Sequence, residues 1–370
     1  MRFAYFTHSL VSCWNHGNAH FVRGVHRELA KRGHRVRALE PADGWSRANL
    51  LRDHGTGAIQ DFNRHFPDLR VTMYGPRFDV AAALAEMDVV IVHEWTDPEL
   101  IVAIGRLRRS GADFLLLFHD THHRAVSDPE AVRLFDPSAY DGGLVFGEAL
   151  AEIYRAQGWD AGRIHVWHEA ADTTIFRPLD HEEQRRGVVW VGNWGDGERN
   201  AEIEQFLLNP VAELGLPLDI YGVRYPRDAL DRLDRYGAAY HGWLPNARVP
   251  ELFARHVATI HVPRRFYTQR LPGIPTIRVF EALACGIPLI CAPWSDSEGL
   301  FRPGEDFAVA RSGDEMRREL DALMHDPDRR AYLAANGLAR IRARHTCAHR
   351  VDELLQIVES LRPTLQQGVA

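Results

Sequence analysis

The stretch RRFYTQRLPGIPTIRVFEALACGIPLICAPW, residues 264–294, decides the fold of this part of the chain. It opens with a loop rich in glycine and proline and continues into a helical segment from Thr276 to Cys285. Gly286 predicts the end of that helix, and the apolar run 287–291 predicts a strand. Because an apolar run also precedes the stretch, the order is strand, loop, helix, strand, which is the unit of a parallel sheet.

The same alternation of short apolar runs and helical stretches extends over the rest of the chain. In the first half, strands are predicted at residues 2–7, 36–39, 88–93, 114–119, 143–146 and 164–167, with helices at 20–32, 98–109 and 148–157. In the second half, further strands are predicted at 188–192, 218–221 and 259–262, and helices at 314–324, 329–344 and 350–361. This pattern predicts α/β architecture with doubly wound parallel sheets.

A length of 370 residues favours two domains over one. The alternation is lost over residues 168–186, which we interpret as the linker. We therefore expect a first, acceptor-side domain at 1–170 and a second, donor-side domain at 187–350, facing a central cleft. Residues 351–370 are expected to form a C-terminal helix and tail that can cross back to the first domain.

Composition narrows the classes of protein that need considering. The formal net charge of -6 argues against a nucleic-acid or anionic-membrane binder. No stretch resembles a signal peptide or is apolar over the roughly 18 residues of a transmembrane helix, so the cytoplasm is the expected compartment. The four cysteines have no CxxC spacing and are expected to be buried free thiols: Cys13, Cys285, Cys291 and Cys347.

Lys31 is the only lysine in the chain. It lies at the polar end of a predicted amphipathic helix that Gly33 closes, where it is poorly placed for chemistry. Walker-type phosphate loops and pyridoxal phosphate both need a placed lysine. No cofactor is therefore expected, and any phosphate must be bound by arginines, backbone amides or helix ends.

The helix from Thr276 offers such a helix end. Thr276 is the expected N-cap, and Thr276 and the amides of Ile277 and Arg278 are expected to bind the donor at this helix end. Glu281 lies in the same helix among apolar residues, where an ionised carboxylate needs a partner. Ribose or sugar hydroxyls could supply one. The alternatives are an ion pair with Arg278 or a place on the solvated face.

Two loops at predicted strand ends carry further candidates. Arg199 ends the turn-rich loop that begins at Asn193, and a guanidinium there could bind a diphosphate. Pairing of Arg199 with Glu198 or Glu202 on the surface is the alternative. His119 ends an apolar run and could contact a sugar hydroxyl or the reacting centre; a structural histidine or, less favoured, a metal ligand are the alternatives.

The segment His16–His20 lies between the first strand and the first helix. Gly17 lets backbone amides approach a ligand closely, but the segment is no GxGxxG fingerprint. His16 and His20 are expected to be surface or acceptor-side residues, and no metal site is expected.

Residues 280–288, FEALACGIP, resemble the donor-binding helix of family-4 glycosyltransferases with the GT-B fold. Gly17, His119 with Asp120, and residues 172–178 (DTTIFRP) resemble three further motifs of that family. The similarity extends over nearly the whole chain and is strongest to the spore-maturation CgeB-like branch. It implies two Rossmann-like domains.

The resemblance implies a retaining, metal-independent transfer of a sugar, a hexose by class, from a nucleoside-diphosphate donor to an acceptor that stays unidentified; a UDP-sugar is the favoured donor. Glu281 matches the family residue that holds the ribose, and Arg199 matches the second basic residue that binds the diphosphate. His119 matches the histidine of the catalytic centre.

The chain departs from the family pattern at two positions. Gly273 stands eight positions before Glu281 where the family has an acidic residue, and Asn193 stands where an arginine is usual. These departures leave open a catalytically silent nucleotide-sugar binding protein. A sugar-nucleotide epimerase or phosphorylase of the same fold is a less favoured alternative, because phosphorylases of this fold carry a pyridoxal lysine and Lys31 is misplaced for it.

Overall fold

The computed structural model describes residues 1–182, 184–195 and 197–367 and divides into two compact units. The first unit comprises residues 1–13, 21–169 and the C-terminal segment from Cys347 onward; the second comprises residues 14–20 and 170–346. Within the described residues, no helix combines the length and the apolar character needed to cross a membrane.

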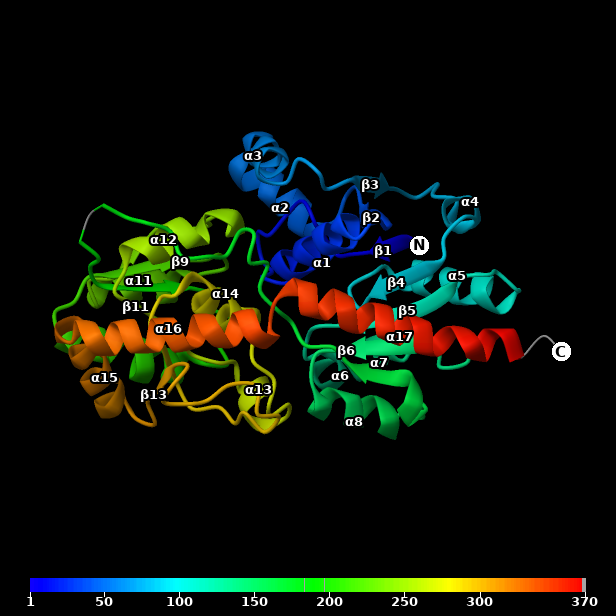
Figure 1. The fold of residues 1–370 in the computed structure, drawn as a ribbon. Helices are drawn as coiled ribbons and strands as arrows, with labels where there is room; N and C mark the ends of the chain where they lie inside the picture. Colours follow the sequence, from blue (N-terminus) through cyan, green and yellow to red (C-terminus); the bar gives the residue numbers. More distant parts are fainter. Residues whose placement is uncertain (183, 196, 368–370) are drawn as a thin grey trace. The chain divides into compact units, whose positions relative to one another are not determined.

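The first unit is built on a parallel sheet of seven strands in the order β3-β2-β1-β4-β5-β6-β7 (Figure 1). The strands are β1 (Arg2–Phe6), β2 (Arg35–Pro41), β3 (Val71–Tyr74), β4 (Val89–His93), β5 (Leu115–Asp120), β6 (Gly142–Val145) and β7 (Ile164–Val166). The connecting helices are α2 (Trp45–His54), α3 (Gly57–His65), α4 (Val80–Leu84), α5 (Pro98–Arg109), α6 (Arg124–Ser127), α7 (Pro129–Val132) and α8 (Glu148–Ala156). Strands β4 and β5 are buried along their whole length, which explains why their sequences are continuous apolar runs.

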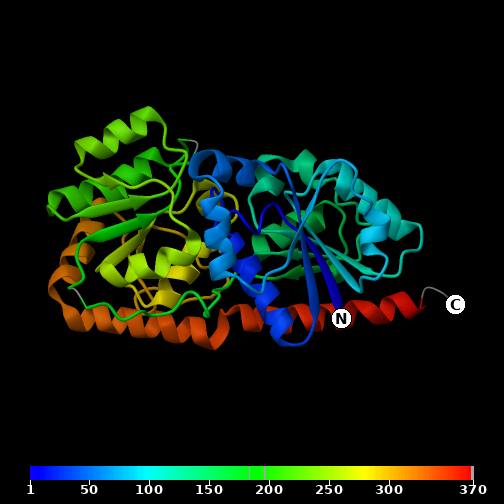
Figure 2. The same cartoon turned by 90° about the horizontal axis from the view of Figure 1, so that it is seen from above.

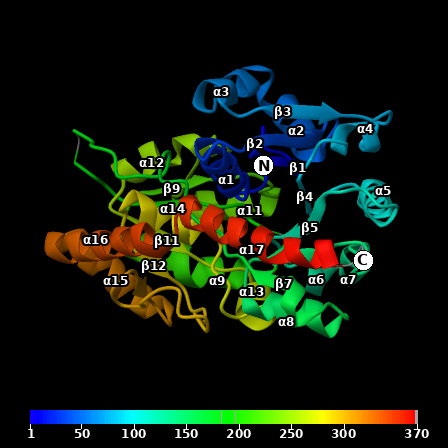
Figure 3. The same cartoon turned by 45° about the vertical axis from the view of Figure 1, so that its right-hand side comes forward.

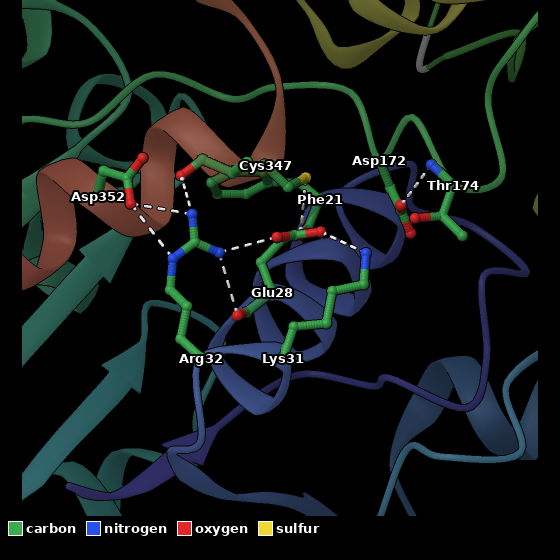
Figure 4. A network of polar contacts seen from close by, with 9 residues as sticks. Phe21, Glu28, Lys31, Arg32, Asp172, Thr174, Cys347 and Asp352 are labelled. Atoms are coloured by element: carbon green, nitrogen blue, oxygen red, sulfur yellow. Dashed lines mark hydrogen bonds and ion pairs between the residues drawn. The ribbon is translucent and has the colours of Figure 1, made fainter.

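Helix α17 (Cys347–Gln367) packs against β5 of this unit, as Figures 1 and 3 show. It is tied to the end of α1 (Ala19–Lys31), a helix through which the division between the units passes. Arg32 donates hydrogen bonds to the Asp352 carboxylate at 2.9 Å, to the Ala348 carbonyl at 3.1 Å and to Glu28 at 2.8 Å (Figure 4). The chain beyond residue 346 is therefore part of the first unit.

The second unit is built on a parallel sheet of six strands in the order β10-β9-β8-β11-β12-β13. The strands are β8 (Val188–Val191), β9 (Leu218–Tyr221), β10 (Ala239–Tyr240), β11 (Ala258–His261), β12 (Leu289–Cys291) and β13 (Ala308–Val309). Helices lie on both sides of this sheet in Figure 2: α9 (Asn200–Ile203), α10 (Asn209–Glu213), α11 (Arg227–Arg235), α12 (Val249–Arg255), α13 (Arg265–Gln269), α14 (Ile277–Cys285), α15 (Gly313–His325) and α16 (Pro327–Arg344).

Both sheets reverse their strand order once, so the predicted doubly wound architecture is confirmed. The reversal lies between β1 and β4 in the first unit and between β8 and β11 in the second. Ligands of open α/β sheets bind at the carboxyl ends of the strands beside such a reversal. We therefore expect a ligand site of the second unit at the loops after β8 and β11.

Candidate functional site

Arg199 spans the point where the strand order of the second unit reverses. Its guanidinium donates to the carbonyl of Val262, after β11, and to the carbonyl of Asn193, after β8, each at 2.6 Å. The guanidinium carbon also lies 5.4 Å from the centre of the Trp190 ring. Arg199 thus holds two ligand-site loops together, which is a different role from the surface pairing with Glu198 or Glu202 that the sequence left open.

One donor of the Arg199 guanidinium, its Nε–H, is not used by the described part of the chain. Its Nε is buried and has no hydrogen-bond partner among the residues that the structure describes, where Arg199 also forms no ion pair. Burial, and next the nearby charge of Arg264, lower the pKa of Arg199 to about 10, so the side chain stays cationic at neutral pH. A buried cation with an unused N–H favours an anion beside it.

The N-terminus of α14 lies in the same part of the unit. Thr276 has the extended backbone of an N-cap residue, but its hydroxyl makes no capping bond to the helix. The hydroxyl instead lies 3.1 Å from Nε2 of His261, the last residue of β11. Thr276 therefore occupies the predicted N-cap position without capping the first-turn amides of Ile277 and Arg278.

The imidazole of His261, at the end of β11, is affected by two cationic side chains of the second unit. Burial is the main cause that lowers the pKa of His261 to about 3, and the charges of Arg199 and Arg278 lower it further. The two guanidinium groups thus act on one imidazole, which stays neutral. The ends of β8 and β11 and the start of α14 form a cationic cluster of the kind that binds a diphosphate.

Gly17 and Asn193 are placed against this cluster. A β-carbon at Gly17 would lie 2.6 Å from Cγ2 of Ile277, so only glycine allows this close approach. The Asn193 side chain donates to the backbone carbonyl of Asn15 at 3.0 Å and accepts from the amide of Val223 at 2.9 Å. Asn193 therefore orders the loops around Arg199.

Glu281 is fully buried and has protein partners. It accepts hydrogen bonds from Nδ1 of His20 at 2.9 Å and from Nδ2 of Asn246 at 2.7 Å, and it pairs with the Arg278 guanidinium. Burial alone would raise the pKa of Glu281, but Arg278, His20 and Asn246 outweigh it and the pKa is lowered. The carboxylate is thus ionised and satisfied without any ligand hydroxyl, so its part in ribose recognition stays a prediction.

The expectation that His20 is a surface or acceptor-side residue was wrong. His20 is 2% exposed and belongs to the second unit. Its ring stacks on Phe176 with 3.9 Å between centroids, and its Nε2 accepts from the amide of Asp172 at 2.7 Å. Because Nε2 of His20 accepts a hydrogen bond, Nδ1 carries the ring proton and donates it in the hydrogen bond to Glu281. The DTTIFRP motif therefore helps to fix Glu281.

Gly273, where the resembled family has an acidic residue, has a structural reason to be glycine. Its backbone is left-handed, with φ of 90°, and a β-carbon there would lie 2.3 Å from Oγ of Ser297. An acidic side chain would require both the backbone and Ser297 to move. The departure from the family pattern is thus built into this loop.

A pocket of about 520 Å³ lies beside the Arg199 loop. A β-carbon at Gly195, one of its lining residues, would come within 3.9 Å of Arg199 Nε. The pocket is lined by Trp194, Gly195, Gly197, Asn200, Arg224, Tyr225, Pro226 and Asp228. Its volume is typical of small-molecule sites.

His119 lies in the first unit and is completely buried. Its Nδ1 is hydrogen-bonded to the Tyr5 hydroxyl, and its ring lies 4.9 Å from that of Trp167 and 6.0 Å from that of Phe21. Burial lowers the pKa of His119 to about 3. These are the surroundings of a core histidine, the alternative that the sequence left open, and the catalytic role stays a prediction.

A pair of carboxyl groups lies at the ends of β4 and β5. Glu94 accepts from the amide of Thr121 at 3.1 Å, and Asp120 accepts from the Tyr154 hydroxyl at 2.6 Å. Burial raises the pKa of both groups, and the charge of Asp120 raises the pKa of Glu94 further. Protonation of these two carboxyl groups is therefore more favourable than protonation of exposed carboxyl groups.

The residues that sequence reasoning missed are His261, Asn246, Glu94 and the partner role of His20. His261 could have been found, since it is a polar residue at the carboxyl end of an apolar run. Asn246 carries no such signal, because its contact with Glu281 joins two segments 35 residues apart in the sequence. The predicted donor-side residues, in contrast, all fall in the second unit: Gly17, Asn193, Arg199, Thr276, Ile277, Arg278 and Glu281.

Comparison with known proteins bears on this arrangement. Residues 198–356, which include Arg199 and α14, match the model of a family described as glycosyl transferase-like. No curated protein matches the sequence.

Solved structures match over the whole chain. Anabaena HepE in complex with UDP and glucose has a TM-score of 0.68 at 15% identity, with 97% of this chain and 100% of that chain covered. Sucrose-phosphate synthase from Thermosynechococcus elongatus has a TM-score of 0.66 at 14% identity, covering 98% and 100%. T4 phage BGT in complex with its UDP-glucose substrate has a TM-score of 0.61 at 13% identity, covering 97% and 99%. At these identities the likeness shows the fold, and the chain has the GT-B fold of glycosyltransferases.

Proposed function

We propose that the protein is a glycosyltransferase that moves a sugar, a hexose by class, from a nucleoside-diphosphate donor to an acceptor. The observation that carries the proposal is the cationic cluster at the strand reversal of the second unit. There the buried Nε–H of Arg199 has no partner among the described residues, and the Thr276 side chain does not cap the start of α14. The solved structures of similar fold hold UDP or UDP-glucose, which supports a UDP-sugar as donor.

The chemistry of these residues suits a metal-independent reaction. As the bond to the sugar breaks, negative charge grows on the leaving diphosphate, and Arg199 with the amides of Ile277 and Arg278 would stabilise it. The resemblance to retaining enzymes supports a mechanism in which the leaving phosphate helps to deprotonate the acceptor. In this proposal the first unit takes the acceptor, the chain works in the cytoplasm, and its relatives belong to the CgeB-like branch.

A second candidate is a protein that binds nucleotide sugars without transferring them. The left-handed backbone at Gly273 disfavours an acidic side chain at the position that touches the sugar in the resembled family, and this favours the second candidate.

The test begins with thermal unfolding in the presence of UDP, GDP and TDP, each with and without EDTA. A ligand at about 100 times its dissociation constant stabilises the folded state by about 2.7 kcal/mol, which is readily measured. We expect UDP to stabilise the protein equally in EDTA. Consumption of UDP-glucose then separates the two candidates: turnover supports the transferase, and binding without turnover supports the second. Absence of stabilisation by all three nucleotides would contradict both.

A further inference from the structure

The N-cap residue of α14 does not cap its helix. Thr276 has φ of −81° and ψ of 160°, the geometry in which a threonine hydroxyl ordinarily accepts from a first-turn amide. Its hydroxyl is instead engaged by Nε2 of His261 at 3.1 Å. The helix therefore forgoes a stabilising bond that a threonine at this position ordinarily supplies.

The proton on the His261 ring decides where the Thr276 proton goes. His261 is neutral, so only one ring nitrogen carries a proton. Its Nδ1 is buried and has no partner in the described part of the chain. A lone pair at Nδ1 is better tolerated than a buried, unpaired N–H. The tautomer with the proton on Nε2 follows, and Nε2–H donates to Oγ1 of Thr276.

A hydroxyl that accepts from His261 has its own proton free to donate. Thr276 is half-buried, so part of the residue is open to solvent. The free proton lies at the helix end whose amides, at Ile277 and Arg278, the side chain leaves uncapped. Several donors therefore gather where an anion would be held.

We propose that the Thr276 hydroxyl, oriented by His261, donates a hydrogen bond to the diphosphate of the donor, so that Thr276 is a catalytic residue and His261 its positioning residue. The inference rests on the proposed function, because it presumes that a nucleoside diphosphate binds at α14. It adds a phosphate ligand, and the residue that aims it, to a site otherwise made of arginines and amides. Charge that grows on the leaving diphosphate strengthens this hydrogen bond during transfer.

The test uses Thr276→Val, which removes the hydroxyl at nearly constant shape, and Thr276→Ser, which keeps it. Thr276→Val should weaken UDP binding about tenfold, the usual loss for a hydrogen bond to a charged group, and Thr276→Ser should stay near wild type. Thr268→Val is the matched control, since the Thr268 hydroxyl is exposed and donates to the carbonyl of Arg265 in its own helix at 3.2 Å.

The positioning role has its own test. His261→Leu should reproduce the loss seen in Thr276→Val, and the double variant should lose no more than either single one. His261→Gln, whose amide can donate to Thr276, should recover part of the UDP affinity. Circular dichroism confirms folding, and the two Thr276 variants suffice if His261→Leu does not fold.

Two results would overturn the inference: equal UDP affinity in wild type and Thr276→Val, or additive losses in the double variant. A wild type that binds no nucleotide would overturn the proposed function as well. Normal UDP binding by wild type with no effect of Thr276→Val would refute this inference alone.

Discussion

Replacing Glu281 by glutamine probes the most completely buried ionic contact of the candidate site. The carboxylate is 0% exposed and receives hydrogen bonds from His20, Asn246 and Arg278. The amide oxygen of a glutamine can keep the bonds from His20 and Asn246. Its NH₂ group then faces the Arg278 guanidinium, a donor opposite a donor, and the ion pair is lost.

The cost follows from the burial of the two partners. Breaking a fully buried ion pair costs about 3–5 kcal/mol, but the Arg278 side chain is 22% exposed and water can reach part of it. We therefore expect Glu281→Gln to lower the free energy of unfolding by about 2–3 kcal/mol. For a unit of this size that corresponds to a melting temperature lower by roughly 5–10 °C.

Thermal and urea unfolding of both proteins measure this difference. Glu213→Gln is the matched control, because Glu213 is 60% exposed and lies 3.7 Å from Arg317; it should change stability by less than about 0.5 kcal/mol. The folded-state pKa of Glu281 is lowered, so its stabilisation is present above the unfolded pKa and is lost as the pH falls through the folded pKa. The gap between wild type and Glu281→Gln should therefore narrow in acid.

A melting temperature for Glu281→Gln within about 1 °C of wild type at pH 7 would refute this reasoning. If UDP binding were lost at the same time, Glu281 would act on the ligand, as the resemblance to family-4 glycosyltransferases implies, and its protein partners would contribute little.

Three further outcomes are expected. His119→Ala should lower the melting temperature by at least about 6 °C, because it opens a buried cavity and strands the Tyr5 hydroxyl, and should leave the dissociation constant of UDP unchanged; lost turnover at normal stability would instead make His119 catalytic. For Glu94, the raised pKa means that the unfolded chain ionises first, so the stabilisation that depends on this carboxyl group is lost as the pH rises above its unfolded pKa; the melting temperature of wild type relative to Glu94→Gln should therefore fall between pH 5 and 8, and a constant difference would contradict the raised pKa. Arg32→Ala should cost about 1 kcal/mol and speed amide exchange in α17, as measured by mass spectrometry; unchanged exchange would mean that Arg32 does not hold the helix.

The sequence predicted those elements whose signals are local. Strands β4 and β5 were found because buried parallel strands are continuous apolar runs, and the end of α14 because Gly286 adopts the left-handed backbone, with φ of 64°, that helix ends favour. Strand β3 was missed since most of its side chains are not buried, and β10 and β13 because each has only two residues. Such strands are defined by pairing rather than by composition.

The sequence predicted single residues of the candidate site, but not the contacts that join residues far apart in the chain. Arg199 could be chosen from its place after a strand, but its two carbonyl acceptors, which make it a brace between loops, depend on the folded chain. Of the partners of Glu281, Arg278 could be named as an alternative because it lies three residues away on the same helix, whereas His20 is 261 residues away in the sequence and could not. The sequence predicted sugar or ribose hydroxyls as partners of Glu281, whereas in the structure protein side chains supply its hydrogen bonds.

The central claim, that the cationic cluster of the second unit binds a nucleoside diphosphate, is tested most directly by calorimetric titration of UDP into wild type, Arg199→Ala and the control Arg227→Ala. Arg227 is a suitable control because its side chain is 90% exposed. We expect wild type and Arg227→Ala to bind UDP alike. Arg199→Ala should bind UDP about ten- to hundredfold more weakly, as expected for loss of a charged hydrogen bond. Equal UDP affinity in Arg199→Ala and wild type, with both proteins folded, would contradict the central claim.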